Sequence, residues 1–361
     1  MIACHSLIGV AGDTPRARTH PGVRVEAERL SLLSCRSLSA LRNVVCGALS
    51  TAVFIAGIAS ARQITLKEVL TVGKRGEFIR VEDAASDSRG NLYVSDSYQF
   101  SIRKFTPDGV TAGQFGHRGK DPDGLAAFPY KIGVRGDTLA FAQVGLSTIR
   151  LLTTDFRPAG EILAAGPVVA FAFNGTGKLY VSVIPISHRK EDVLVRYSSD
   201  GGIDARIPLL RARGEPAMDI VQMAVDGMDR LIVAYRYVNE IAVYSPDCRL
   251  ILSFSVPGFP AEAPSTKSKY AGLGAIPDSD IIKDVAVDPK GNILVLAGDC
   301  GKHPGRDVYV FSPAGKLLTT FLLPDKSGIL RVDPGGCLLV REHERTLVRR
   351  YRMHFGKTRQ G

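Results

Sequence analysis

Residues 87–94 read Asp87-Ser88-Arg89-Gly90-Asn91-Leu92-Tyr93-Val94, a glycine turn that leads into an apolar strand. The same pattern recurs at 174–181, 226–233, 288–295 and 333–340, with a weaker copy at 133–140. Aspartate, asparagine and glycine supply the backbone angles of tight turns. Self-similarity at a period of roughly 20–50 residues is typical of repeat architectures. The sequence therefore predicts six copies of one small β unit.

A second strand follows the first in most copies and ends in a turn of its own. The clearest examples are 102–105 before Thr106-Pro107-Asp108-Gly109 and 308–311 before Ser312-Pro313-Ala314-Gly315. The first strands, such as Leu-Ile-Val-Ala-Tyr at 231–235, show little polar alternation. Such runs indicate strands that are buried on both faces, as in sheets that pack between two other sheets. We therefore expect an all-β, six-bladed β-propeller over residues 62–355.

The ring needs a closing strand. The sixth copy ends after its third strand near Tyr351, whereas residues 64–70 form a predicted strand that no repeat precedes. Pairing of these two segments would complete the last blade and leave no open edge. Residues 257–281 lengthen the spacing between the fourth and fifth copies and are predicted to be an inserted loop.

The unit at 87–109, and nearly as well the unit at 284–315, resembles the NHL repeat. The resemblance covers about 290 residues and implies a propeller fold; NHL propellers include binding modules, sensor domains and a few enzymes. The chain has no tryptophan, which argues against WD-type and quinoprotein propellers.

The N-terminal region predicts export. Residues 44–61 form an uncharged, mainly apolar stretch that ends in Ala59-Ser60-Ala61, which is typical of a signal peptide cleaved before Arg62 or of a membrane anchor. Either would place the propeller in the periplasm or outside the cell. Residues 1–43 are too long for the start of a signal and are interpreted as a disordered extension or a start site assigned too early. Residues 356–361 form a basic tail.

The chain carries a formal net charge of +10. A dispersed excess of this kind is explained by a solvated surface, although it also favours anionic partners. The densest basic cluster is predicted to be a sheet edge with one wet face: Arg341, Arg345, Arg349, Arg350, Arg352, Lys357 and Arg359. Nucleic-acid binding would need the cytoplasm and stacking aromatic residues, and the sequence indicates neither.

Three cysteines follow the apolar stretch, namely Cys248, Cys300 and Cys337. They are odd in number and have no Cys-x-x-Cys spacing, which argues against a zinc cluster. The repeat places Cys248 and Cys300 on opposite rims, so we expect no disulfide.

Loops from several blades meet at a rim or a channel mouth, where propellers bind ligands. If the glycine turns lie on one rim, the connections after the first apolar strands lie on the other. The candidate binding residues on that second rim are Asp96, Tyr98, Gln143, Tyr235, Arg236, Tyr237, Asp299, Glu342 and His343. Tyr98, Tyr235 and Tyr237 predict an aromatic patch there. No catalytic residue is predicted.

The same connections carry His188, His303 and His343. Propeller enzymes similar to this class, such as the amidating lyase of peptidyl-hydroxyglycine, hold zinc with histidines from different blades, so zinc is the alternative cofactor. No His-x-His or His-Glu-x-x-His spacing fixes two ligands on one element, and no segment aligns with the ligand set of gluconolactonase-type propellers. Solvated loop histidines are therefore the favoured interpretation. Asp278-Ser279-Asp280 could bind calcium, although such a triplet is also typical of a turn.

Two functional hypotheses follow. The first is a non-enzymatic exported propeller that binds a protein or glycan through one rim, without a cofactor. The alternative is a metal-dependent lyase or hydrolase with its site at the channel mouth. A structural role in a larger envelope assembly is not separable from the first hypothesis by sequence.

Overall fold

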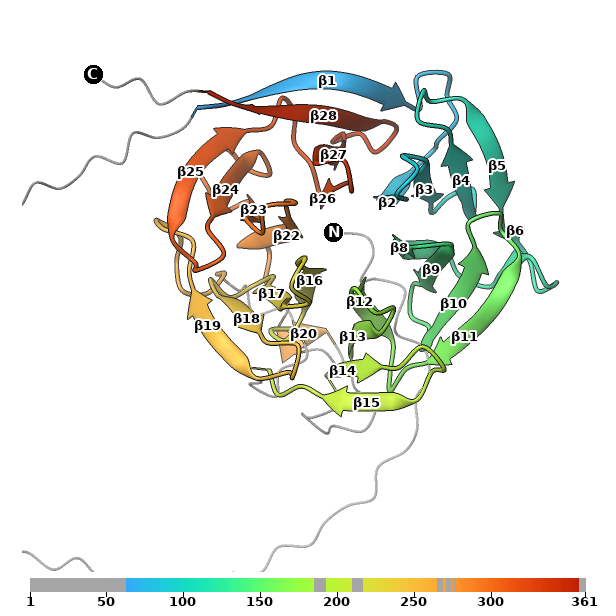
Figure 1. Ribbon diagram of the computed structural model, residues 1–361, viewed down its shortest axis with the longest axis horizontal. Helices are drawn as coiled ribbons and strands as arrows, with labels where there is room; N and C mark the ends of the chain where they lie inside the picture. The colour runs from blue at the N-terminus through green and yellow to red at the C-terminus, as the bar shows by residue number, and fades with distance from the viewer. Residues whose placement is uncertain are drawn as a thin grey trace, which may run out of the picture. The chain divides into compact units, whose positions relative to one another are not determined.

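The computed structural model describes residues 63–184, 193–209, 217–264, 269–270, 274–275 and 277–356. These residues form strands and turns and contain no helix. Six four-stranded antiparallel sheets are arranged around a central axis, with one strand of each sheet nearest the axis (Figure 1). The predicted all-β, six-bladed propeller is thus confirmed.

Each blade numbers its strands outward from the axis. Blade 1 contains β2 (Val81–Ser86), β3 (Leu92–Asp96), β4 (Ser101–Phe105) and β5 (Thr111–Phe115). Blade 2 contains β8 (Pro129–Arg135), β9 (Thr138–Gln143), β10 (Thr148–Thr153) and β11 (Pro158–Leu163). Blade 3 contains β12 (Val168–Phe173), β13 (Leu179–Val183), β14 (Leu194–Tyr197) and β15 (Ile203–Arg206).

The second half of the ring follows the same order. Blade 4 contains β16 (Val221–Val225), β17 (Leu231–Tyr235), β18 (Ile241–Tyr244) and β19 (Leu250–Phe254). Blade 5 contains β22 (Ile282–Val287), β23 (Ile293–Ala297), β24 (Asp307–Phe311) and β25 (Leu317–Leu322). Blade 6 contains β26 (Leu330–Val332), β27 (Cys337–Arg341), β28 (Val348–Phe355) and, outermost, β1 (Ile64–Val72).

The glycine turns join the first and second strands of a blade through one repeated set of hydrogen bonds. In blade 1, the Asp87 carboxylate accepts the backbone N–H groups of Arg89 and Asn91 at 3.0 and 2.9 Å. Gly90 has a φ of +84°, which glycine adopts without the steric cost of a Cβ. Asp288 makes the same pair of bonds in blade 5. The Asp-x-x-Gly-Asn signature is therefore the chemistry of this turn.

The second strand of each blade is the centre of the core. All five residues of β17 are buried, as are all five of β23. Because each blade is covered by a blade on either side, an uninterrupted apolar strand is buried on both faces. This confirms the expectation drawn from the unalternating runs.

The ends of the propeller are joined in blade 6. Strand β1 pairs antiparallel with β28, from Ile64 opposite Phe355 to Val72 opposite Val348, with one irregularity between Glu68 and Leu70. The predicted closing strand is confirmed (Figure 1). The closure also corrects the interpretation of the basic cluster: β28 is an inner partner of β1 and not a sheet edge, and Arg341 and Arg350 are buried.

Several predictions lie partly or wholly outside the described residues. These are the extension at 1–43, the apolar stretch at 44–61, nearly all of the tail at 356–361, and His188. Of the insertion at 257–281, the described part includes a bridge between Val238 and Glu262 and the short pair β20 (Lys269–Tyr270) and β21 (Gly274–Ala275). Another short pair, β6 (His117–Arg118) and β7 (Gly124–Leu125), precedes blade 2.

Cys248, Cys300 and Cys337 are free thiols in the structure. None of the described residues forms an apolar helix of membrane-spanning length.

Candidate ligand site at the channel mouth

The inner strands of the six blades run in the same direction through the ring. Each one ends at a turn to its second strand, so these turns lie on one rim, which we call the turn rim. The starts of the inner strands and the ends of the second strands lie on the opposite rim, which we call the mouth rim. The candidate binding residues chosen from the sequence come from the connections of the mouth rim.

A cavity of about 250 Å3 opens on the mouth rim. Every blade contributes the first residues of its inner strand, or those just before it, to the lining: Glu82, Tyr130, Lys131, Val168, Val169, Ile220, Gln222, Lys283, Gly328 and Ile329. Connections add further residues, among them Val144, Ile184, Arg236, Asp280, Asp299 and Arg345, and Arg341 at the end of β27. This cavity is the mouth of the central channel.

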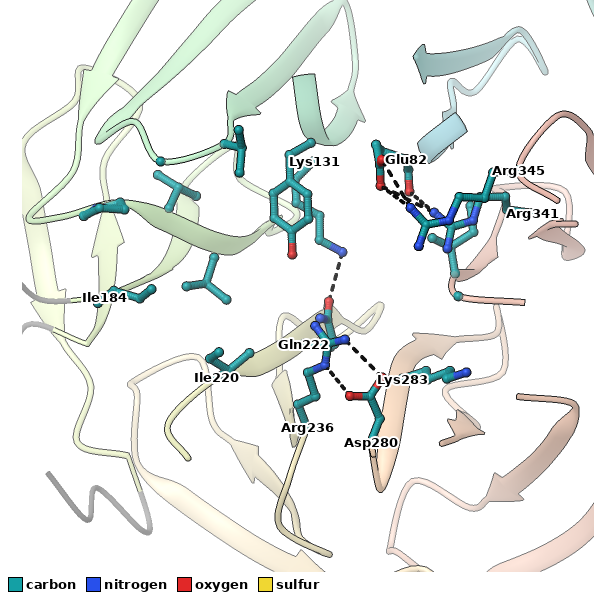
Figure 2. A pocket seen from close by; sticks show the side chains of 18 of the residues that line it. Glu82, Lys131, Ile184, Ile220, Gln222, Arg236, Asp280, Lys283, Arg341 and Arg345 are labelled. Atoms are coloured by element: carbon teal, nitrogen blue, oxygen red, sulfur yellow. Dashed lines mark hydrogen bonds and ion pairs between the residues drawn. The ribbon is translucent and has the colours of Figure 1, made fainter. Parts of the chain in front are cut away.

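Three arginines surround one carboxylate at the side of the cavity between blades 6 and 1. Glu82 lies 3.0 Å from Arg80 Nε, 3.4 Å from Arg345 Nη1 and 3.7 Å from Arg341 Nη1. Its Oε1 also accepts a hydrogen bond from the Ser97 hydroxyl at 2.9 Å. Glu82 is 8 % exposed. One buried carboxylate thus faces three guanidinium groups, and the cluster has an excess of two positive charges (Figure 2).

The excess shifts the titration of the arginines themselves. Burial, followed by the charge of Arg345, lowers the pKa of Arg341 to about 10. Burial also lowers the pKa of Arg345, with a further contribution from Arg80 that Glu82 only partly offsets. Both groups stay protonated at neutral pH, but the site holds them at a cost. An additional negative charge would relieve that cost.

Two ion pairs form another part of the lining. Arg236 binds Asp280 through two hydrogen bonds of 2.7 and 3.1 Å, and Lys283 Nζ lies 2.7 Å from Asp299 Oδ1. Burial opposes the charge of Arg236, but the adjacent carboxylate of Asp280 outweighs it and raises the pKa of Arg236. These cations are therefore neutralised locally, unlike the cluster around Glu82.

Lys131 forms the floor of the cavity. Its Nζ donates to Gln222 Oε1 at 3.0 Å, which joins blade 2 to blade 4 across the axis (Figure 2). Burial lowers the pKa of Lys131. Beneath it, Arg331 of blade 6 bonds both Asp83 of blade 1 and Asp284 of blade 5. This polar belt separates the mouth from a second cavity, of about 450 Å3, on the turn rim.

Blades 2, 3 and 4 supply an apolar wall opposite the arginines. In Figure 2, Ile184 and Ile220 lie across the cavity from Arg341 and Arg345. The wall is completed by Val144, Pro167, Val168 and Val169. The mouth therefore has one cationic side and one apolar side.

The structure brings only two of the predicted binding residues to the cavity lining, Arg236 and Asp299. Several others support the cluster from behind. Asp96 is fully buried and accepts the backbone N–H groups of Ile79 and Arg80 at 2.7 and 3.2 Å. The exposed Tyr98 ring lies 5.8 Å from the guanidinium of Arg80. Glu342 is ion-paired with Arg349 and its carbonyl accepts the N–H of Arg345.

The remaining predicted residues do not meet at the mouth. Tyr235 and Tyr237 are buried, at 0 and 4 % exposure, because they belong to the packed core of blade 4, so Tyr98 alone of the three tyrosines is exposed. Gln143 is buried and accepts the N–H of Ala127. His343 is exposed on the connection between β27 and β28.

Sequence reasoning missed Glu82, Lys131 and Gln222, and it assigned Arg341 and Arg345 to a sheet edge. A signal was present, because each of the three missed residues is a polar interruption near the start of an inner strand. The strands read Val-Glu-Asp-Ala-Ala-Ser, Pro-Tyr-Lys-Ile-Gly-Val-Arg and Val-Gln-Met-Ala-Val. Polar side chains at the same level of several inner strands must meet around the axis.

The predicted metal ligands do not converge in the described part of the chain. His303 Nδ1 lies 3.0 Å from Asp307 Oδ1, and His343 belongs to another blade. Among the described residues there is no group of three or more His, Cys, Asp or Glu side chains that could hold a metal ion. His188 falls outside them. The residues present do not fit zinc or calcium at the mouth, where the Glu82 carboxylate is occupied by arginines.

No protein-family model matches the chain, and no curated protein matches it. Solved structures do. Virginiamycin B lyase from Staphylococcus aureus is 13 % identical and aligns over 82 % of this chain and 89 % of its own, with a TM-score of 0.52. A gluconolactonase from Xanthomonas campestris is 14 % identical over 83 % and 93 % of the two chains, also with a TM-score of 0.52.

A protein of unknown function from Bacteroides thetaiotaomicron is 12 % identical and aligns over 82 % of this chain and 74 % of its own, with a TM-score of 0.52. At these identities the likeness extends to the fold alone. The chain is a six-bladed β-propeller with structural neighbours that include enzymes and a protein of unknown function.

Proposed function

We propose that this protein is an exported, NHL-like recognition propeller that binds part of a protein or glycan ligand in the channel mouth, without catalysis. The observation that carries the proposal is the cavity to which all six blades contribute, closed below by the bond between Lys131 and Gln222. A concave site with an apolar side and a few convergent polar groups is the usual form of a ligand site.

The state of the carboxylates favours binding over catalysis. Glu82 contacts three arginines, Asp280 is held by Arg236, and Asp299 by Lys283. A general base must be able to reach a substrate proton with a free lone pair. Here each carboxylate of the lining is engaged by a cation, and the groups left to face a ligand are positive or apolar.

The alternative of a metal-dependent lyase or hydrolase has no observation of its own in the described residues. The lining carries five cationic side chains, Lys131, Arg236, Lys283, Arg341 and Arg345, against the three carboxylates Glu82, Asp280 and Asp299. A divalent cation would have to compete with arginines for each carboxylate. Elemental analysis of the purified protein tests this alternative.

The proposal is tested by blocking the mouth. The full chain is applied to glycan and peptide arrays, and each hit is measured by calorimetry against Ile184→Trp, which fills the apolar side without changing charge. Leu163→Trp is the matched control, because Leu163 lies on the outermost strand of blade 2 and is 74 % exposed.

The proposal expects binding to be lost in Ile184→Trp and kept in Leu163→Trp, with the ligand recovered chemically unchanged. Equal binding by both variants would remove the mouth as the site. Conversion of the ligand into a product, followed by mass spectrometry, would show that the protein is an enzyme.

A further inference from the structure

We infer that the group recognised at the mouth is a carboxylate attached to an apolar body, held by Arg341 and Arg345 on one side and by the Ile184–Ile220 wall on the other. This inference rests on the proposed function and names the chemistry of its ligand. The shared chemistry has two sources: a free branched or acyl acid, and the C-terminus of a peptide that ends in an apolar residue.

The first step is the charge of the cluster. Three guanidinium groups lie within 3.0 to 3.7 Å of the single carboxylate of Glu82, so two positive charges have no countercharge there. Guanidinium groups bind carboxylates through paired, charge-assisted hydrogen bonds. An incoming carboxylate would therefore gain from both arginines that line the cavity, whereas a cationic or neutral group would leave the repulsion in place.

The second step is the incomplete bonding of Arg341, which is only 8 % exposed. Its Nη1 donates to the carbonyl oxygens of Val81 and Glu82, both at 3.1 Å. Its Nε is buried and has no hydrogen-bond partner among the described residues. A buried N–H without a partner is costly, and a ligand oxygen is the kind of group that would satisfy it.

The third step is the backbone of Arg345, which has a φ of +62°. A side chain with a Cβ is strained in this left-handed region, and such residues persist where the surrounding structure holds them. Arg345 is held on both sides, since its N–H donates to Glu342 and its carbonyl accepts the N–H of Val81 at 2.7 Å. Glycine would suit this position better for stability, so the guanidinium is what the position gains from arginine.

The fourth step is the opposite wall. Val168, Val169 and Ile220 are between 4 and 8 % exposed, and Ile184 closes the same side. Branched aliphatic side chains offer no partner to the hydroxyl groups of a sugar, and they favour an aliphatic group of the ligand. The two walls together select an acid with an apolar body over an inorganic anion or an uncharged hydrocarbon.

The test uses calorimetry on the full chain with four probes. 4-Methylpentanoate is the free acid, and 4-methylpentanamide is its neutral match. N-Acetyl-leucine represents a peptide C-terminus, and N-acetyl-leucinamide is its neutral match. We expect each acid to bind at least about tenfold more tightly than its amide, because the amide cannot replace a carboxylate between two arginines.

The two acids distinguish the sources. Tighter binding of N-acetyl-leucine indicates a peptide C-terminus, and tighter binding of 4-methylpentanoate indicates a free acid. Equal binding of acids and amides would overturn the inference but leave the mouth as a ligand site. Sulfate that binds as tightly as 4-methylpentanoate would overturn the apolar half of the inference, and failure of both acids to bind at millimolar concentration would overturn all of it.

Three variants place the site. Arg345→Gly removes the guanidinium at a position whose backbone suits glycine, so we expect loss of acid binding with the melting temperature retained. Gly328→Ala removes no charge, but its Cβ would collide with Nη2 of Arg341, a flexible end that can move. We expect this variant to fold and to bind the acid more weakly.

Arg352→Gln is the matched control, because Arg352 is exposed on β28 and its loss changes the net charge by the same amount as Arg345→Gly. It should bind the acids as the wild type does. Wild-type affinity in Arg345→Gly, or an equal loss in Arg352→Gln, would contradict the assignment of the arginines at the mouth.

Discussion

Arg331 joins Asp83 and Asp284, two carboxylates that stand at the third position of the inner strands of blades 1 and 5. Each carboxylate also accepts a backbone N–H from the neighbouring inner strand, that of Ile132 for Asp83 and that of Leu330 for Asp284. The charges of Asp284 and Asp83 raise the pKa of Arg331 against the opposing effect of burial. One side chain thus links three adjacent blades around the axis.

Removal of Arg331 should therefore weaken the ring. Arg331→Met leaves two buried carboxylates without a cation, and we expect the free energy of unfolding to fall by about 3 kcal/mol in chemical denaturation. Adding Asp83→Asn and Asp284→Asn removes the unpaired charges and should recover part of the loss. A triple variant that is less stable than Arg331→Met would contradict this account of the belt.

Lys131 gives the belt a pH dependence. Its pKa in the folded protein is lowered from 10.5, so the unfolded chain holds a proton that the folded chain releases as the pH approaches 10.5. Stability rises with pH wherever the unfolded state binds more protons. The free energy of unfolding of the wild type minus that of Lys131→Met should therefore increase between pH 7 and pH 10. A difference that stays constant or falls over this range would show that the lysine is not held at a cost.

Gly298 tests the support of the mouth. A Cβ at this position would collide with the carbonyl oxygen of Asp280, the partner of Arg236. Gly298→Ala should lower the free energy of unfolding by about 1–3 kcal/mol, because the backbone must shift. The control is Gly227→Ala, where nothing lies within 4 Å of the added Cβ. Thermal and chemical denaturation of the two variants compare them directly, and similar losses would argue against the close approach.

Gly201 tests the turns without steric interference. It has a φ of +86°, and the nearest atom to an added Cβ is 3.8 Å away. Gly201→Ala should cost about 1–2 kcal/mol through the left-handed backbone alone. Because Gly227→Ala serves again as the control, a neutral result at Gly201 would mean that the repeated turn can change its backbone conformation freely.

The blade count and the closing strand could be predicted from sequence because both depend on local signals. Gly90, Gly291 and their counterparts mark turns, and the run from Leu231 to Tyr235 marks a strand buried on both faces. The unpaired strand at the beginning of the described chain then had one place to go. These features follow from backbone angles and burial, which neighbouring residues largely determine.

The site could be predicted only to the level of a rim. Whether a polar residue on an inner strand faces the axis depends on the register, which shifts between Val81 and Ala84 in β2 and between Pro129 and Lys131 in β8. A shift of this kind changes which side chains face the channel, and no turn residue announces it. Glu82 and Lys131 were therefore missed, and Arg345 was recognised as basic without its place at the mouth.

The most direct measurement is a crystal structure of the full chain with 4-bromobenzoate, whose bromine is located by anomalous scattering. The account predicts bromine against Ile184 and Ile220, with the carboxylate within hydrogen-bond distance of Arg341 and Arg345. Bromine bound only elsewhere, while the mouth stays free of ligand at a saturating concentration, would contradict it.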